Sequence, residues 1–186
     1  MTFDGTMTLH RDAAHHAEFE VCYETHFTRV YHLCLRYAGG DTAFAEDLTH
    51  EVFEKLLVHL PSLSEHEDLG GWLYRVATNQ ALSRLRQRRT FRQWLERALG
   101  SEPEPEHEAA ADHAFETREL AGAALEVLRT LPAKERVVLC MKLLDGLSQQ
   151  EIAQTLSMSK GYVSKLVARG VTALRAAGWE VDDGPA

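Results

Sequence analysis

One stretch near the C-terminal end limits the possible folds more than any other, because it predicts two short helices joined by a tight turn. It spans residues 146–175. Ser148 and Glu151 stand three residues apart near its start, which is the spacing of a capping box that begins a helix. The turn follows at 157–159, and a second helix is expected directly after it.

The second helix predicts a function as well as a shape. Val163, Val167 and Leu174 recur on one side of it and form an apolar face. Its other side is basic, and no acidic residue occurs between positions 160 and 175. A tight helix pair whose second helix is basic fits the major groove of DNA. The alternative is an ordinary helical hairpin with a solvated basic face.

Composition narrows the class of protein. The 186 residues leave room for one ordinary domain or two small ones. No apolar run approaches the roughly 20 residues of a membrane span, and the first residues lack the charged-then-apolar pattern of a signal peptide. Cys22, Cys34 and Cys140 are odd in number and far apart, which favours reduced thiols. We therefore expect a cytoplasmic protein without membrane insertion.

The net charge of -8 is unevenly distributed along the chain. Residues 101–116 hold six acids and no Lys or Arg, and they include Pro103 and Pro105 but no apolar stripe. This composition predicts an extended, flexible acidic linker. Since the linker carries most of the excess negative charge, the net charge does not argue against DNA binding by the rest of the chain.

Hydrophobic periodicity predicts helices on both sides of this linker. Apolar residues recur at steps of three and four in three segments between positions 19 and 85, and no strand-like alternation of useful length occurs. Asp41 is expected to cap the second helix, Pro61 to end it and Ser64 to cap the third. We expect an all-α protein with an N-terminal tail at 1–17, a three-helix domain at 18–97, a flexible acidic linker at 98–116, a helix-turn-helix domain at 117–177 and a C-terminal tail at 178–186.

Three motifs indicate a protein family. They are AEDLTHEVF at 45–53, WLYRVATN at 72–79, and LPAKER followed by EIAQTL within 131–156. In this order and at this spacing they resemble the extracytoplasmic-function (ECF) sigma factors, the smallest promoter-recognition subunits of bacterial RNA polymerase. The resemblance implies an alternative sigma factor that binds core RNA polymerase and directs promoter-specific transcription initiation. It implies no enzymatic activity and no cofactor.

The resemblance implies that the helix carrying the first motif docks on the polymerase clamp. A mostly acidic helix face suits a basic partner, although a solvated face is an alternative. Asp47 and His50 lie one turn apart, but matching carboxylate–histidine pairs on other predicted helices are missing, so no metal site is expected. The polymerase-binding residues implied are Glu46, Asp47, His50, Glu51 and Glu54.

The third predicted helix resembles the family's reader of the minus-ten promoter element. Aromatic, amide and guanidinium side chains can stack on unpaired bases or hydrogen-bond to them, and six arginines between positions 84 and 97 suit phosphates. The alternatives are core packing of Trp72 and a solvated, arginine-rich helix end. The DNA-binding residues implied are Trp72, Tyr74, Arg75, Asn79, Ser83, Arg86, Arg88 and Arg89.

The helix after the turn resembles the family's reader of the minus-thirty-five element. Here Leu166 stands where the family has a basic, DNA-contacting residue. Its side chain could touch a thymine methyl group or extend the core. The DNA-binding residues implied are Lys160, Tyr162, Ser164, Lys165 and Arg169.

Two other classes of function are compatible with a helical protein of this size: a regulator that acts through protein contacts and an enzyme. A sigma-like regulator could keep the fold and act through protein contacts, as a decoy or a non-initiating polymerase binder, and Leu166 and the acidic linker favour this reading. A helical enzyme is not supported, because the ten histidines are scattered and no HExxH motif or phosphate-binding glycine loop occurs. The resemblance also implies an anti-sigma protein as a partner, beside core RNA polymerase and promoter DNA.

Overall fold

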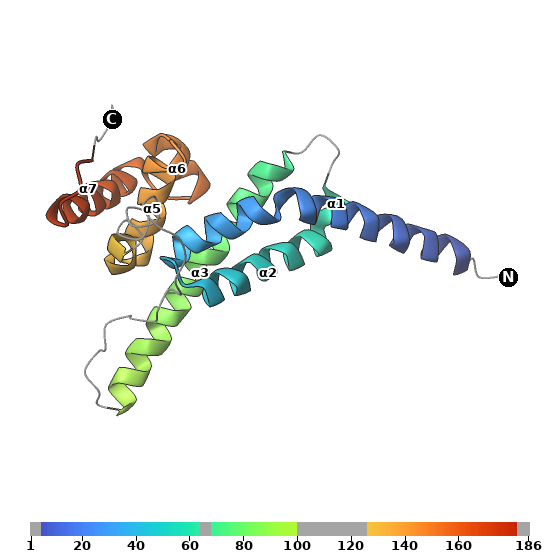
Figure 1. Ribbon diagram of the computed structural model, residues 1–186, viewed down its shortest axis with the longest axis horizontal. Helices are drawn as coiled ribbons and strands as arrows, with labels where there is room; N and C mark the ends of the chain where they lie inside the picture. The colour runs from blue at the N-terminus through green and yellow to red at the C-terminus, as the bar shows by residue number, and fades with distance from the viewer. Residues whose placement is uncertain (1–4, 64–67, 100–125, 182–186) are drawn as a thin grey trace, which may run out of the picture.

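The computed structural model describes residues 5–63, 68–99 and 126–181 (Figure 1). Within these ranges the regular structure is entirely helical, without strands, so the all-α prediction is confirmed. Most of the predicted linker lies outside the described residues, and so does Ser64, the expected cap of the third helix.

Three long helices form the first unit: α1 (Gly5–Ala38), α2 (Thr42–His59) and α3 (Leu69–Leu99). α1 begins inside the range expected to be a tail, where the sequence offers no apolar stripe that would reveal a helix. α3 continues into the range expected to be linker, and its C-terminal end extends beyond the ends of α1 and α2 (Figure 1).

Local signals explain the joints between these helices. Gly39 and Gly40 have φ angles of 70° and 87°, which glycine adopts without strain. Asp41 then caps α2 as predicted, because its Oδ1 accepts a hydrogen bond of 2.8 Å from a backbone N–H in the first turn. α2 ends in a 3-10 turn, η1 (Leu60–Ser62), that contains Pro61.

The core of the first unit lies where its three helices meet. Each helix turns its apolar stripe inward, and this leaves the polar sides of α2 and α3 facing outward. The buried side chains of this core include Val30, Leu33, Cys34 and Tyr37 from α1, Leu48, Val52 and Leu56 from α2, and Leu73, Ala77 and Ala81 from α3.

The described part of the second unit contains helical residues 126–130 followed by α5 (Ala133–Leu143), α6 (Gln149–Thr155) and α7 (Lys160–Ala176). The predicted capping box is present, because Ser148 Oγ accepts from the Glu151 N–H at 3.2 Å and the Ser148 N–H donates to Glu151 Oε2 at 2.8 Å. Gly170 lets α5 and α7 approach closely, since a Cβ there would lie 2.9 Å from Leu139 Cδ1. α6 and α7 therefore form the predicted helix-turn-helix, with α5 packed against both.

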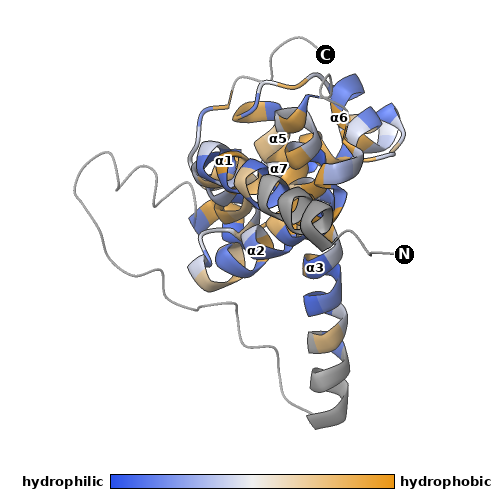
Figure 2. Cartoon of the chain, turned by 90° about the vertical axis from the view of Figure 1, so that its right-hand side faces the viewer, coloured by the Kyte–Doolittle hydropathy of each residue, from blue (hydrophilic) through white to orange (hydrophobic). Residues whose placement is uncertain are grey.

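The two units are packed against each other. α5 contacts both α1 and α3 (Figure 1), and the buried apolar residues of both units belong to one hydrophobic core. Figure 2 shows hydrophobic residues around α5 and α7, which pack against each other. A search of the described helices finds none with the length and apolar character that a membrane crossing requires.

Candidate polymerase and nucleic-acid interface

The outer face of α2 carries four of the five side chains assigned to polymerase binding. All four are exposed, and at about 100° per residue they fall within an arc of roughly 100°. Leu48 and Val52 from the same motif point the other way and are buried, and Phe53 is buried against aromatic rings of α1. The outer face of α2 consists of Glu46, Asp47, His50 and Glu54.

Glu51, the fifth residue of this set, lies at the edge of α2 that faces α3. Its carboxylate forms an ion pair with Arg84 and accepts a hydrogen bond of 2.8 Å from Gln80 Nε2. These groups line a wide polar groove between the two helices. Glu51 therefore joins α2 to α3, and a polymerase contact through it has to compete with Arg84.

The outer face of α3 brings together six of the eight residues assigned to the minus-ten element. At about 100° per residue they lie within an arc of roughly 120°. Five of them are exposed, and Trp72 is half-buried with its ring centroid 5.8 Å from that of His59. The outer face of α3 consists of Trp72, Arg75, Asn79, Ser83, Arg86 and Arg89.

Tyr74 lies on the opposite side of α3, away from the expected DNA face. Its hydroxyl donates to Asp145 Oδ2 at 2.8 Å and accepts from the Tyr37 hydroxyl at 3.4 Å. Burial raises the pKa of both phenols well above the usual range, so both keep their protons at physiological pH. In this conformation Tyr74 holds protein groups together and does not face the DNA side.

Arg88 extends toward the start of α2, and its side chain stays 52% exposed. Its Nη1 donates to Asp41 Oδ2 at 2.9 Å, and its guanidinium lies 3.8 Å from the centroid of the Phe44 ring. The cation thus braces the start of α2 against α3. Periodicity reveals this, because Arg88 falls on the same side of α3 as the buried residues Ala77 and Ala81.

The exposed face of α7 carries all five residues assigned to the minus-thirty-five element. Leu166 lies on the other side and is 3% exposed, packed with Val163 and Val167. Of the two roles considered for Leu166, the structure therefore supports core packing. The exposed face of α7 consists of Lys160, Tyr162, Ser164, Lys165 and Arg169.

The first turn of α5 contributes two charged side chains to this surface that sequence reasoning missed. Lys134 Nζ lies 5.4 Å from the centroid of the Tyr162 ring. Glu135 Oε1 lies 3.7 Å from Arg169 Nη1. No local pattern reveals these pairs, because they depend on how α5 packs against α7.

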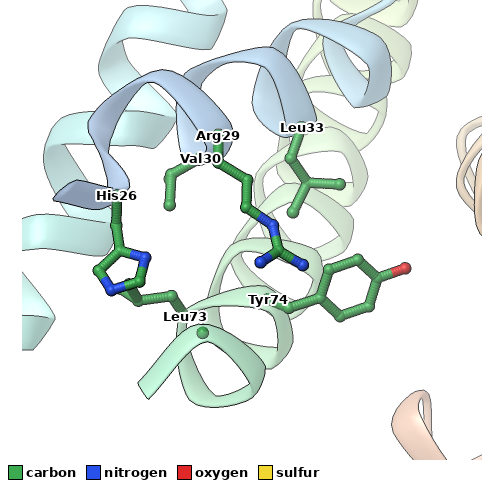
Figure 3. A pocket seen from close by; sticks show the side chains of 7 residues that line it. His26, Arg29, Val30, Leu33, Leu73 and Tyr74 are labelled. Atoms are coloured by element: carbon green, nitrogen blue, oxygen red, sulfur yellow. The ribbon is translucent and has the colours of Figure 1, made fainter. Parts of the chain in front are cut away.

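One cavity, between α1 and α3, is small. Figure 3 shows His26 and Arg29 reaching from α1 toward Leu73 and Tyr74 on α3, around a cavity of about 10 Å³. Such a volume holds one water molecule at most. Among the described residues, no group of three or more His, Cys, Asp or Glu side chains is placed to hold a metal ion.

Two protein families match separate parts of the chain. Sigma-70 region 2 matches residues 22–91, and Sigma-70 region 4 matches residues 127–176. The first match falls on α1 to α3, and the second covers α5 to α7.

Relatives and solved structures agree with these matches. The chain is 31% identical to the ECF RNA polymerase sigma factor SigW of Bacillus subtilis, over 79% of this chain and 81% of that protein. It is 30% identical to the ECF sigma factor SigE of Mycolicibacterium smegmatis, over 81% of this chain and 57% of that protein.

Among solved structures, the fold resembles the sigma factor RpoE in complex with the anti-sigma factor NepR from Bartonella quintana. The TM-score is 0.62 at 18% identity, covering 86% of this chain and 96% of that one. CnrH in complex with the cytosolic domain of CnrY has a TM-score of 0.54 at 19% identity, with 85% of each chain covered. The family matches and the identity to SigW place the protein in a family of transcription regulators: the chain belongs to the ECF sigma factors.

Proposed function

We propose that this alternative sigma factor binds core RNA polymerase through the outer face of α2 and reads promoter DNA with two separate surfaces. The outer face of α3 contacts the minus-ten element, and the exposed face of α7 contacts the minus-thirty-five element. The predicted domains at 18–97 and 117–177 carry these surfaces. The chain itself performs no catalytic step, and it acts in the cytoplasm, where polymerase and promoter DNA are found.

The single observation that carries the proposal is the segregation of side chains on α3. Arg75, Arg86 and Arg89 are exposed on one side, with the amide of Asn79 among them. Guanidinium groups suit the phosphates of a DNA strand, and an amide can hydrogen-bond a base edge. The apolar side of the same helix is buried, so this face is held in place by the core.

The acidic outer face of α2 supports the polymerase contact in a similar way. Asp47 and Glu54 are exposed while Leu48 and Val52 are buried beneath them. A rigid helix presenting carboxylates suits a basic partner surface, because complementary charges speed encounter and fix orientation.

The alternative, a sigma-like regulator that acts only through protein contacts, is not favoured. The sequence favoured it through Leu166, as a lost DNA contact, and through the acidic linker. Leu166 is a core residue, and most of the linker lies outside the described residues. Near Leu166, the basic side chains of Lys165 and Arg169 are exposed. The recognition helix therefore keeps a surface suited to DNA.

An anti-sigma protein is part of the proposal. One solved structure that resembles this fold is the sigma factor RpoE in complex with the anti-sigma factor NepR. By analogy, a partner of this chain is expected to cover one or more of the three surfaces described above.

Co-purification followed by genome-wide mapping tests the proposal. Tagged protein should retain core RNA polymerase, and the DNA bound with it should concentrate at a small set of promoters that share two sequence elements. Retention of polymerase without promoter enrichment would favour the non-initiating alternative, and failure to retain polymerase would refute the proposed function.

A further inference from the structure

The first turn of α5 carries a lysine that belongs to none of the three surfaces described above. Lys134 is the second residue of α5, and its Nζ lies 5.4 Å from the centroid of the Tyr162 ring on α7. A cation over an aromatic ring within about 6 Å of its centroid is attracted to the ring. Tyr162 is part of the exposed face of α7 and is 39% exposed. Lys134 therefore lies at the edge of that face.

Close packing of α5 on α7 fixes this position. Gly170 of α7 has no side chain, and a Cβ there would lie 2.9 Å from Leu139 Cδ1 of α5. Glu135, the residue after Lys134, lies 3.7 Å from Arg169 of α7 through its carboxylate. At about 100° per residue, Arg169 and Tyr162 lie on the same side of α7, two turns apart. The first turn of α5 is therefore held along one edge of the exposed face of α7.

The stability of α5 does not explain the charge of Lys134. The N-terminal end of a helix carries a partial positive charge, which favours an anion in the first turn and disfavours a cation. Glu135 agrees with this preference, whereas Lys134 opposes it. A cation at this position costs the helix stability, but it attracts a negatively charged ligand to the edge of α7.

The dimensions of DNA place this edge over the phosphate backbone. The major groove is about 12 Å wide, and a helix with its side chains is about 10–12 Å across. A recognition helix therefore fills the groove, and an element packed along its edge lies over the phosphates that border the groove. The first turn of α5 is such an element, because α5 packs against α7 (Figure 1).

The carboxylate of Glu135 does not cancel the charge that Lys134 presents. Glu135 is 13% exposed in its side chain and pairs with Arg169, which is 69% exposed. The exposed face of α7 and the first turn of α5 together hold four cations, Lys134 included, and one carboxylate. A surface with this excess of cations suits the backbone of duplex DNA.

We propose that Lys134 is an additional phosphate contact beside the minus-thirty-five element, and that Tyr162 is the positioning residue that holds its ammonium group over the DNA backbone. Phosphates carry no sequence information directly, so the contact adds affinity without reading bases. The inference rests on the proposed function, because it assumes that the exposed face of α7 enters the major groove.

The salt dependence of DNA binding tests the phosphate contact. The full chain with Lys134→Gln is compared with wild type on a duplex that holds the minus-thirty-five element of a mapped promoter, and on the same duplex with the element scrambled. Each phosphate contact contributes about 0.9 to the slope of log affinity against log salt. The affinity advantage of wild type should therefore shrink roughly threefold between about 50 and 200 mM salt, equally on both duplexes.

Lys142→Gln is the matched control, because it removes the same charge from the last turn of α5. Its salt slope should equal that of wild type. Equal slopes for wild type and Lys134→Gln would overturn the proposal. A loss of affinity confined to the unscrambled duplex would also overturn it, because Lys134 would then read a base.

The same two duplexes separate this inference from the proposed function. If wild type prefers the minus-thirty-five duplex but Lys134→Gln has the wild-type slope, only the inference fails. If wild type shows no preference between the duplexes, the role proposed for α7 fails, and the slope difference still shows whether Lys134 contacts phosphate.

The role of Tyr162 is tested through its effect on Lys134. Lys134→Gln is introduced beside Tyr162→Phe, which keeps an aromatic ring, and beside Tyr162→Leu, which removes it. The loss of affinity caused by Lys134→Gln should be as large in the Tyr162→Phe protein as in wild type, and at least twofold smaller in the Tyr162→Leu protein. An equal loss in all three backgrounds would show that Tyr162 does not position the lysine.

Thermal unfolding distinguishes a DNA contact from a structural role. Because the partial charge of the helix end opposes a cation in the first turn, Lys134→Gln should leave Tm equal to that of wild type or slightly higher. A lower Tm together with an unchanged salt slope would mean that Lys134 serves the packing of α5 on α7, and this would contradict the proposal.

Discussion

Asn79 is the residue on the outer face of α3 whose chemistry best suits base recognition. Its amide can donate to and accept from a base edge, whereas the arginines on the same face suit phosphates. Asn79→Ala should therefore impair opening of promoter DNA more than it impairs polymerase binding. Permanganate footprinting of a mapped promoter measures the opening directly.

The control for Asn79 is an exposed residue of α3 outside the DNA-facing arc. Gln87 is such a residue, because it lines the groove toward α2. Gln87→Ala should leave the footprint as in wild type. If Asn79→Ala and Gln87→Ala give the same footprint as wild type, the minus-ten assignment of α3 is wrong.

Glu135 is a second residue whose effect on DNA binding can be measured by substitution. It lies 3.7 Å from Arg169, and since Arg169 is 69% exposed the ion pair is weak. DNA phosphate has to compete with Glu135 for the same guanidinium. Glu135→Gln should therefore tighten binding to a minus-thirty-five duplex by about 0.5–1 kcal/mol, measured as a binding isotherm.

A double-mutant cycle tests this explanation. In an Arg169→Ala background the competition no longer exists, so adding Glu135→Gln should change the DNA affinity very little. If Glu135→Gln has the same effect in both backgrounds, Glu135 acts on DNA through its own charge and not through Arg169.

At the scale of the helix, the outer face of α2 can be tested by charge reversal. Asp47 and Glu54 are suited to this, because Glu51 is engaged with Arg84 and its reversal would also disturb the packing of α2 on α3. The double substitution Asp47→Lys and Glu54→Lys should abolish co-purification with core RNA polymerase, because it reverses the charge presented to a basic partner.

The neighbouring helix supplies a matched control for this experiment. Glu20 and Glu24 are exposed on α1, and reversing both to Lys makes the same change in net charge. This control should retain polymerase, and circular dichroism should show equal helicity for both double mutants. Equal retention by both would place the docking surface elsewhere.

α7 has reading and packing roles at adjacent positions. Leu166 is 3% exposed, and Lys165 beside it is exposed. Leu166→Ala should lower the free energy of unfolding by about 2–5 kcal/mol. Lys165→Ala should change stability by less than about 0.5 kcal/mol and weaken DNA binding by about 1–3 kcal/mol if it contacts a base edge.

Chemical denaturation and DNA-binding isotherms on the same two proteins separate these roles. If Lys165→Ala lowers the free energy of unfolding and Leu166→Ala weakens DNA binding instead, the exposed face of α7 is not the recognition face. It also follows that Leu166→Arg should destabilise the protein, because it would bury a charge instead of adding a DNA contact.

The sequence correctly predicted features, such as helix caps, that depend on interactions between residues close together in the chain. The caps at Asp41 and Ser148 were correct because each is set by bonds to backbone groups three residues away. The helical period places Leu166 between the exposed and the buried side of α7, so its burial depends on which helix covers it. For Tyr74 and Arg88, the helical period indicates positions away from the outer face of α3.

At the scale of the whole molecule, the contact between the two units was beyond the reach of the sequence. Arg36 and Asp145 are 109 residues apart, and neither belongs to a motif that marks it as a partner of the other. Patterns of three and four residues report which side of a helix is buried, but not which helix covers it. The pairs of Arg169 with Glu135 and of Tyr74 with Asp145 were missed for this reason.

The central claim is that this chain directs core RNA polymerase to promoters, and run-off transcription tests it most directly. Purified protein, purified core RNA polymerase and a promoter fragment identified by genome-wide mapping are combined with nucleotides. We expect a transcript of defined length that requires this protein. The transcript should be absent when the protein carries the double substitution Asp47→Lys and Glu54→Lys. Association with polymerase without such a transcript, at every mapped site, would contradict the central claim.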